Sequence, residues 1–190
     1  NAVNTVDGAN GLVSGIFVIS CFIFSNEIGG IAFQSGFYGA SLFLIFNVIS
    51  GRLFLGDAGS YGLGSAMLLS GLAAYSTGVV SLPFLAALYF YPCADFSVSL
   101  LRRWHSGASL TAPDNDHLHN RVNIFFQRIF RSKNMGNSAT GLSIALGSSG
   151  LVLFIYLADY ILLTSNLWLW MFALQSVLYC LIFMSIGKLK

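Results

Sequence analysis

Four short polar clusters interrupt an otherwise apolar chain, and their residue types suit phosphate and metal chemistry. The first holds Asn1, Asn4 and Asp7 at a spacing of three, with Asn10 following. Residues three apart share one face of a helix, so these amides and the carboxylate would offer donors and acceptors to one ligand and its bridging metal. Helix capping is the alternative, because Asn and Asp cap helices well, but capping accounts for one such residue and not for all of them.

The second cluster is centred on Asp57, which has glycines on both sides and is the only acid between Glu27 and Asp95. Magnesium is typically held by one or two carboxylates, with substrate phosphates completing its coordination. Asp57 is therefore a candidate magnesium ligand, and a capping Asp beside turn glycines is the alternative. Phe54, three residues earlier, could stack on a base or simply pack.

The third cluster is Asp95, followed by Arg102 and Arg103. Asp95 lies inside an apolar segment, where a carboxylate needs a partner or a polar cavity. Asp95 and Arg102 are seven residues apart and would share a helix face. Arginine suits phosphate binding, whereas anchoring at the membrane boundary is an equally good account of the pair.

The fourth cluster is a histidine-containing loop. All three histidines of the chain, His105, His117 and His119, fall within one polar stretch, beside Asp116 and Arg121. Neighbouring carboxylates and an arginine favour contact with a phosphate or pyrophosphate over a zinc site, which would need a third soft ligand. Solvated loop residues are the alternative.

Composition defines the surroundings of these clusters. The chain has 190 residues, of which 56% are hydrophobic and 8% are charged, whereas soluble domains carry about 25% charged residues. The net charge of +2 gives no basic surface for nucleic acid. Cys21, Cys93 and Cys180 show no CxxC or Cys/His spacing, so neither a disulfide framework nor a zinc site is expected. The chain begins at Asn1 without a signal peptide, and we expect an incomplete chain.

The apolar segments predict an all-α, polytopic membrane domain over residues 1–190. Six segments approach the ~20 residues that cross a bilayer, and they run at about 8–25, 32–49, 58–76, 82–100, 141–163 and 167–186. Six crossings place both ends of the chain, and all nine basic residues, on one side. The positive-inside rule makes that side cytoplasmic, so the polar stretch at about 101–140 is expected to be a cytoplasmic catalytic loop.

A cytoplasmic amphipathic helix is expected within this stretch. The apolar residues follow the spacing i, i+3, i+4, i+7 and i+8, and they are Val122, Phe125, Phe126, Ile129 and Phe130. Arg121, Arg128 and Arg131 occupy other faces, which is typical of a helix lying on a membrane surface.

At the four clusters the chain resembles the polyprenyl-phosphate N-acetylhexosamine-1-phosphate transferase family. That family includes phospho-N-acetylmuramoyl-pentapeptide transferase and undecaprenyl-phosphate N-acetylglucosamine-1-phosphate transferase. The resemblance rests on segments in matching order and spacing: Asn1 to Leu12, Phe54 to Ser60, Asp95 with Arg102 and Arg103, and Asp116 to His119.

The resemblance implies a bacterial inner-membrane enzyme that uses Mg²⁺, or Mn²⁺, to convert a UDP-sugar and undecaprenyl phosphate into a sugar-diphospholipid and UMP. It also allows a homodimer. By motif, Asp57 resembles the metal-ligating aspartate, and the implied catalytic set is Asp7, Asp57, His117 and His119. Asn47 and Phe54 resemble uridine contacts, and the implied substrate-binding set is Asn4, Asn10, Asn47, Phe54, Arg102 and Arg103.

The chain departs from the family pattern at several points. Asn10 stands where many members have a second Asp, and Asn120 replaces the third residue of a His-rich run. The Asp-Asp pair that family members carry in their N-terminal half is absent from this sequence, so we expect the chain alone to be inactive. A fragment of a membrane transporter is the alternative function, although transport sites lie near the bilayer midplane and these clusters lie at one face.

Overall fold

The computed structural model describes every residue except 108, 110–114 and 188–190. The described residues are helical and contain no strand, which confirms the all-α prediction. The elements are α1 (Ala2–Val6), α2 (Leu12–Glu27), α3 (Ile31–Ser50), α4 (Gly56–Ser76), α5 (Leu82–Leu88), α6 (Phe90–His105), α7 (Leu118–Phe130), α8 (Lys133–Ala145), the π-helical segment η1 (Leu146–Gly150), α9 (Leu151–Leu157) and α10 (Trp168–Gly187).

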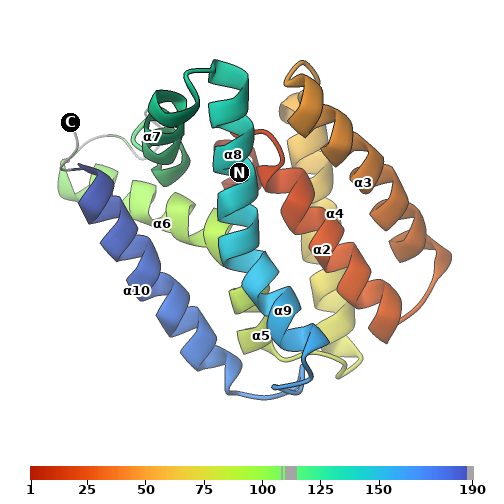
Figure 1. Cartoon of the computed structure of the whole chain (residues 1–190). Helices are drawn as coiled ribbons and strands as arrows, with labels where there is room; N and C mark the ends of the chain where they lie inside the picture. Colours follow the sequence, from red (N-terminus) through yellow and green to blue (C-terminus); the bar gives the residue numbers. More distant parts are fainter. Residues whose placement is uncertain (108, 110–114, 188–190) are drawn as a thin grey trace.

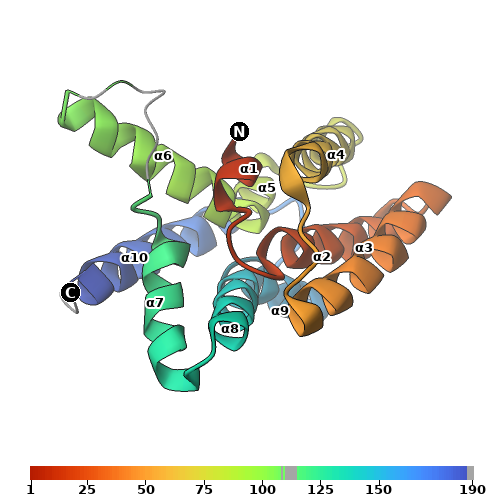
Figure 2. The same ribbon diagram turned by 90° about the horizontal axis from the view of Figure 1, so that it is seen from above.

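The long helices run roughly side by side, with their connections at two opposite ends (Figure 1). Helix α1, the α3–α4 connection, α7 and the start of α8 lie at the upper end of the view. Seen from above, α6 and α7 extend sideways across that end (Figure 2). The upper end therefore collects the segments that carry the polar clusters.

The described residues contain three helices long and apolar enough to cross a membrane, Ile31–Ser50, Lys133–Leu157 and Trp168–Gly187, or up to four if a bent pair counts as one span. The six predicted crossings are therefore not confirmed. The first predicted crossing corresponds to α2, which is apolar but has 16 residues. The third corresponds to α4, whose 21 residues include several glycines and serines that lower its hydropathy.

The fourth predicted crossing is broken rather than straight. Helices α5 and α6 meet at an angle of 79°. Pro92 lies in the first turn of α6, where it lacks an N–H and its ring excludes a straight helical path past the carbonyl of Leu88. Ser149 Oγ instead donates to the Leu88 carbonyl at 2.6 Å. Gln175 Nε2 donates to the Ala87 carbonyl at 3.2 Å, so η1 and α10 satisfy the backbone at the break.

The predicted polar loop at about 101–140 is mostly helical where it is described. It comprises the end of α6, all of α7 and the first turns of α8. Helix α8 already begins at Lys133, because the Ser132 hydroxyl caps it by accepting a hydrogen bond from Met135 N. Helix α7 covers the segment predicted as a cytoplasmic amphipathic helix, and its residues Leu118, His119 and Val122 are buried.

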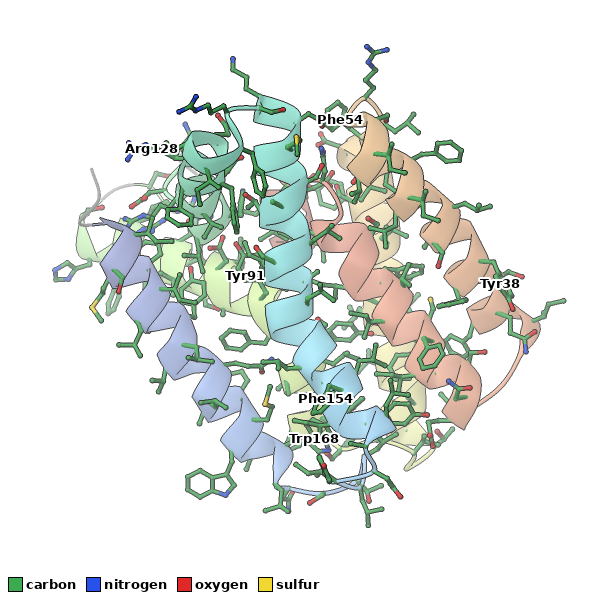
Figure 3. All side chains as sticks on the ribbon, in the orientation of Figure 1. Tyr38, Phe54, Tyr91, Arg128, Phe154 and Trp168 are labelled. Carbon is green, nitrogen blue, oxygen red and sulfur yellow. The ribbon has the colours of Figure 1, made fainter. Side chains whose placement is uncertain are left out.

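Two apolar clusters hold the bundle together. The upper one includes Leu12, Ile16 and Phe90, and the lower one includes Phe84 and Trp168, whose rings meet edge to face at 5.1 Å. Trp168 is labelled near the lower end in Figure 3. Outward-facing positions of α3 and α10 are exposed and apolar, as expected of helices that face lipid.

Candidate active site at the upper end of the bundle

The first cluster is fastened to the start of α4. Ser60 Oγ donates to Asn4 Oδ1 at 2.6 Å, and Tyr61 OH donates to Asn1 Oδ1 at 3.0 Å. Neither Asn1 nor Leu55, the residues that precede α1 and α4, makes a side-chain cap. The side-chain amides of Asn1 and Asn4 therefore connect α1 to α4, and helix capping does not explain these contacts.

This attachment brings the carboxylates of Asp7 and Asp57 into electrostatic contact. Asp7 ends α1 and is half-buried, whereas Asp57 is exposed in the first turn of α4. Burial, and after it the charge of Asp57, raises the pKa of Asp7 to about 6. Two adjacent carboxylates repel each other, and a divalent cation would offset that repulsion.

The chemistry of this pair fits magnesium better than zinc. The described residues contain no group of three His, Cys, Asp or Glu side chains that could hold a metal by themselves. Magnesium requires less from the protein, because it commonly takes one or two carboxylates and fills its coordination with water and substrate phosphates. Asp57, with Asp7 beside it, would be the protein's share of such a site.

Asp95 is buried and forms three hydrogen bonds. His117 Nδ1 lies 2.6 Å from Asp95 Oδ2, Leu118 N donates to Oδ1 at 3.0 Å, and Tyr179 OH donates to Oδ1 at 2.8 Å. The partner that the sequence required for Asp95 is therefore the histidine loop, and not Arg102 on its own helix. This contact ties α6 to the start of α7 and to α10.

His119 connects the histidine loop to the first cluster. Its ring stacks on that of His117, with centroids 5.4 Å apart and planes 10° apart. A Cβ placed on Gly8 would lie 2.9 Å from His119 Nε2, so this nitrogen lies against the residue that follows Asp7. Burial lowers the pKa of His119 to about 4, which keeps the ring neutral near pH 7. Asp7, Asp57, His117 and His119 thus gather at one end of the bundle.

The two predicted phosphate arginines have other contacts. Arg102 Nη1 lies 3.5 Å from Asp116 Oδ2, and Arg103 donates to the carbonyl and hydroxyl of Ser99. Arg121 holds Asp116 more tightly, through two hydrogen bonds of 2.7 Å, and this partner raises the pKa of the guanidinium. Arg121 Cζ also lies 3.7 Å from the centroid of the Phe183 ring on α10.

Asn10 and Asn47 lie in a buried amide network. Asn10 N donates to Asn137 Oδ1 at 2.8 Å, and its side chain donates to Asn134 Oδ1 and Ser138 Oγ, both at 3.2 Å. Asn47 Oδ1 accepts from Gly11 N at 2.6 Å. These partners hold the 8–11 turn against α8 and the end of α3, so the structure places both amides as supports of the first cluster.

Phe54 is the most open of the predicted site residues. It is 67% exposed on the α3–α4 connection, and Figure 3 shows it at the upper end of the molecule. An exposed aromatic ring close to Asp57 in the sequence is positioned to stack on a planar ligand.

Sequence reasoning missed several residues that build the site. Tyr91 OH accepts from His119 N at 3.0 Å and lies 3.3 Å from His119 Nδ1, and Tyr179 holds Asp95. Asn134 and Asn137 hold Asn10 from the first turns of α8. Their spacing of three on one helix face is a signal that could have been noticed.

Fold and site together define a helical membrane protein with a carboxylate pair and a histidine pair at one end. Residues 1–77 match the family model described as Glycosyl transferase family 4. The named relatives below confirm the resemblance found from the motifs.

The relatives include proteins from several bacteria. The chain is 31% identical over 140 residues to the "Probable undecaprenyl-phosphate N-acetylglucosaminyl 1-phosphate transferase" of Bacillus subtilis (strain 168), which covers 66% of this chain and 37% of that protein. It is 30% identical over 152 residues to the "Decaprenyl-phosphate N-acetylglucosaminephosphotransferase" of Mycobacterium tuberculosis (strain ATCC 25618 / H37Rv), covering 64% of this chain and 37% of that protein.

A third relative carries a different name. The "Phospho-N-acetylmuramoyl-pentapeptide-transferase" of Clostridioides difficile (strain 630) is 36% identical over 98 residues, which is 47% of this chain and 30% of that protein. The chain thus spans 37% of the length of each of the first two relatives named above. No solved structure matches the chain significantly.

Proposed function

We propose that this chain forms the C-terminal part of a phospho-glycosyltransferase that moves a sugar-1-phosphate from a UDP-sugar to undecaprenyl phosphate and releases UMP. The named relatives support this reaction class, because two of them are named as transferases of N-acetylglucosamine phosphate to a polyprenyl phosphate. The observation that carries the proposal is the convergence of Asp7, Asp57 and the histidine pair at one end of the bundle.

In the proposed reaction, an oxygen of the lipid phosphate attacks the β-phosphorus of the UDP-sugar. A bond forms between that oxygen and the β-phosphorus, and the bond from the β-phosphorus to the bridging oxygen breaks, so that UMP leaves with the electron pair. Two anionic reactants repel each other, and pairing that negative charge with fixed donors lowers the barrier. Bound Mg²⁺ would supply Lewis-acid stabilisation of the phosphate oxygens.

The chain's own residues would bind and orient the two substrates. Asp57 would hold the cation, and Asp7, fixed at the end of α1, would position it. We assign Asp7 a positioning role, because a phosphate monoester, with a second pKa near 6, is already largely ionised at pH 7 and needs no strong base. Phe54 would stack on the uracil ring, and His119 would contact a phosphate oxygen.

We propose that the upper end faces the cytoplasm of a bacterial inner membrane. The described basic residues at this end include Arg52, Arg121, Arg128 and Lys133, and Figure 3 places Arg128 there while Trp168 lies at the other end. This distribution follows the positive-inside rule. The amphipathic helix α7 would then lie along the inner surface of the membrane.

The test measures UMP release by a protein that contains this chain and is as long as the named relatives. The protein is placed in lipid nanodiscs with Mg²⁺, undecaprenyl phosphate and UDP-N-acetylglucosamine. We expect UMP and a sugar-diphospholipid in equal amounts, no product after chelation, and no product from residues 1–190 alone. UDP-N-acetylgalactosamine and UDP-N-acetylmuramoyl-pentapeptide serve as further donors to define the sugar. No UMP from any of these donors, together with uptake of labelled UDP-sugar into proteoliposomes, would replace the transferase with a transporter.

A further inference from the structure

The hydrogen bonds around Asp95 determine which nitrogen of His117 carries a proton. Asp95 accepts from Leu118 N and Tyr179 OH at Oδ1, and both of these donors favour its ionised form. An ionised carboxylate only accepts hydrogen bonds, so the 2.6 Å contact at Oδ2 requires a proton on His117 Nδ1.

The hydrogen bonds around Tyr91 lead to the reverse arrangement in His119. The backbone N–H of His119 donates to Tyr91 OH at 3.0 Å, so the oxygen of Tyr91 already acts as an acceptor. The hydroxyl is buried, and among the described residues His119 Nδ1, at 3.3 Å, is the acceptor within its reach, so its own proton is directed there. His119 Nδ1 therefore accepts, and the proton of the neutral ring resides on Nε2, the atom that lies against Gly8 beside Asp7.

We infer that Asp95 and Tyr91 give Nδ1 of the two stacked histidines opposite roles, a proton donor in His117 and a proton acceptor in His119, and that Tyr179 on α10 fixes Asp95 in the position that makes this possible. His119 then presents an Nε2–H donor to a phosphate oxygen, whereas His117 commits its Nδ1 proton to Asp95. Asp95, Tyr91 and Tyr179 are positioning residues, since each acts through a histidine. The inference rests on the proposed transferase function only for the identity of the phosphate.

This arrangement is more specific than a loop anchored by an ion pair. A structural anchor would need only that α6, α7 and α10 stay together. Asp116 already supplies such a link, because it lies 3.5 Å from Arg102 on α6 and is bound by Arg121 on α7, which packs on Phe183 of α10. Tautomer control instead predicts that removing one hydroxyl group changes the protonation pattern of a ring while the helices stay in place. The two explanations therefore differ in a spectroscopic observable.

The first experiment is nitrogen NMR of the whole protein labelled with ¹⁵N-histidine, in nanodiscs and without substrate. Bonded protons distinguish the two ring nitrogens of each histidine, and the variants His105→Gln, His117→Gln and His119→Gln assign the signals. We expect a proton on Nδ1 of His117 and on Nε2 of His119. Tyr91→Phe should convert His119 to a mixture of tautomers and leave His117 unchanged, and Asp95→Asn should do the reverse.

The second experiment compares Tyr179→Phe with Tyr156→Phe in the UMP-release assay. Each variant removes one hydroxyl that donates to a carboxylate, Tyr179 to Asp95 and Tyr156 to Glu27 at 2.7 Å on the other side of the bundle. We expect Tyr179→Phe to lower kcat about 10- to 150-fold, as for a lost hydrogen bond to a charged group, with KM for the UDP-sugar unchanged. Tyr156→Phe should match the parent protein.

The outcomes separate the inference from the proposed function. The same protonation of Nδ1 in both histidines, or unaltered ring signals in Tyr91→Phe and Asp95→Asn, would overturn the inference whether or not the protein is a transferase. A protonated Nδ1 in His117 and an unprotonated Nδ1 in His119, in a protein that releases no UMP, would support the inference and remove the transferase. Tyr179→Phe and Tyr91→Phe keep the aromatic ring and remove only the hydroxyl group, so both variants are expected to fold. A thermal unfolding profile close to that of the parent protein checks this.

Discussion

The carboxylate pair and the histidine pair lie side by side at the upper end of the bundle, yet they are built in opposite ways. Asp57 is exposed and Asp7 is half-buried, and burial together with the charge of Asp57 raises the pKa of Asp7. His117 and His119 are buried, stacked and hydrogen-bonded to Asp95 and Tyr91. Under the proposed function the first pair would be completed by a cation, whereas the second is held by hydrogen bonds within the protein.

The largest expected effect comes from removing the carboxylate that we propose holds the metal. Asp57→Ala should reduce UMP release by roughly 10³-fold or more, because Lewis-acid stabilisation of the phosphates supplies several kcal/mol. Asp159→Asn is the matched control, since Asp159 is an exposed acid at the opposite end. Turnover of Asp57→Ala equal to that of the control would take Asp57 out of the metal site and remove the contrast between the two pairs.

The contact between the two pairs can be broken at Gly8. Gly8→Ala would place a Cβ 2.9 Å from His119 Nε2, so the ring or the 7–11 turn must shift. We expect kcat/KM to fall by up to about 10²-fold, the scale of a ~1 Å displacement in an active site. Gly62→Ala on α4 is the control, because a Cβ there meets no atom within 4 Å. Equal activity in both variants would show that the two pairs act independently.

A smaller effect is expected from the amide network that supports the first cluster. Asn10→Ala removes donors to Asn134 and Ser138 and leaves their oxygens buried or partly buried. The free energy of unfolding should fall by about 1 to 3 kcal/mol, as for buried polar groups that lose their partners. Urea titration of the metal-free protein measures it. Asn26→Ala, which loses only a hydrogen bond to Phe22 of its own helix, should change stability by far less.

The smallest effect is a pair of opposite pH dependences. The pKa of Asp7 is raised from 3.8 to about 6, so the folded chain retains a proton that the unfolded chain has released, and this group lowers stability as the pH rises from about 4 to about 6. The pKa of His119 is lowered from 6.5 to about 4, so the unfolded chain binds a proton first and stability falls as the pH drops from about 6.5 to about 4.

Two variants separate these opposing contributions. Metal-free Asp7→Asn should show a Tm that rises with pH between about 4 and 6.5, and His119→Gln should show one that falls, while the parent changes least. Added Mg²⁺ should raise the Tm of the parent near pH 7 more than that of Asp7→Asn. Parallel Tm profiles in the two variants would contradict the assignment of opposite environments to the two pairs.

The sequence predicts the helical membrane fold and the members of the site better than their contacts. Asp57 and His117 were found because polar residues in an apolar chain stand out against a composition of 8% charged residues. The partnership of Asp95 with His117 was not predictable, because it depends on the 79° turn between α5 and α6 and not on helical spacing. The argument from helical spacing had instead favoured Arg102 as the partner of Asp95, because the two residues are seven apart on one helix.

Other contacts of the site could not be predicted because the residue types that make them have two common roles in proteins. Tyr179 belongs to an apolar helix, where a tyrosine is an unremarkable packing residue until its hydroxyl is seen to reach Asp95. Asn10 and Asn47 resemble ligand contacts by motif, yet amides equally serve as buried crosslinks, and the structure uses them in that way. Burial decides between these uses, and burial follows from tertiary packing.

The broken path between α5 and α6 has a consequence for biosynthesis. Ser149 follows Leu88 by 61 residues, and Gln175 follows Ala87 by 88 residues, so the donors for these two carbonyls leave the ribosome long after their acceptors. At ~5 to 20 residues per second, the interval is roughly 3 to 18 s. During that time the nascent kink must be hydrated or shielded by the insertion machinery. Helix α10 therefore completes the membrane insertion of an earlier segment, and polypeptides that stop before it should be degraded as unassembled intermediates.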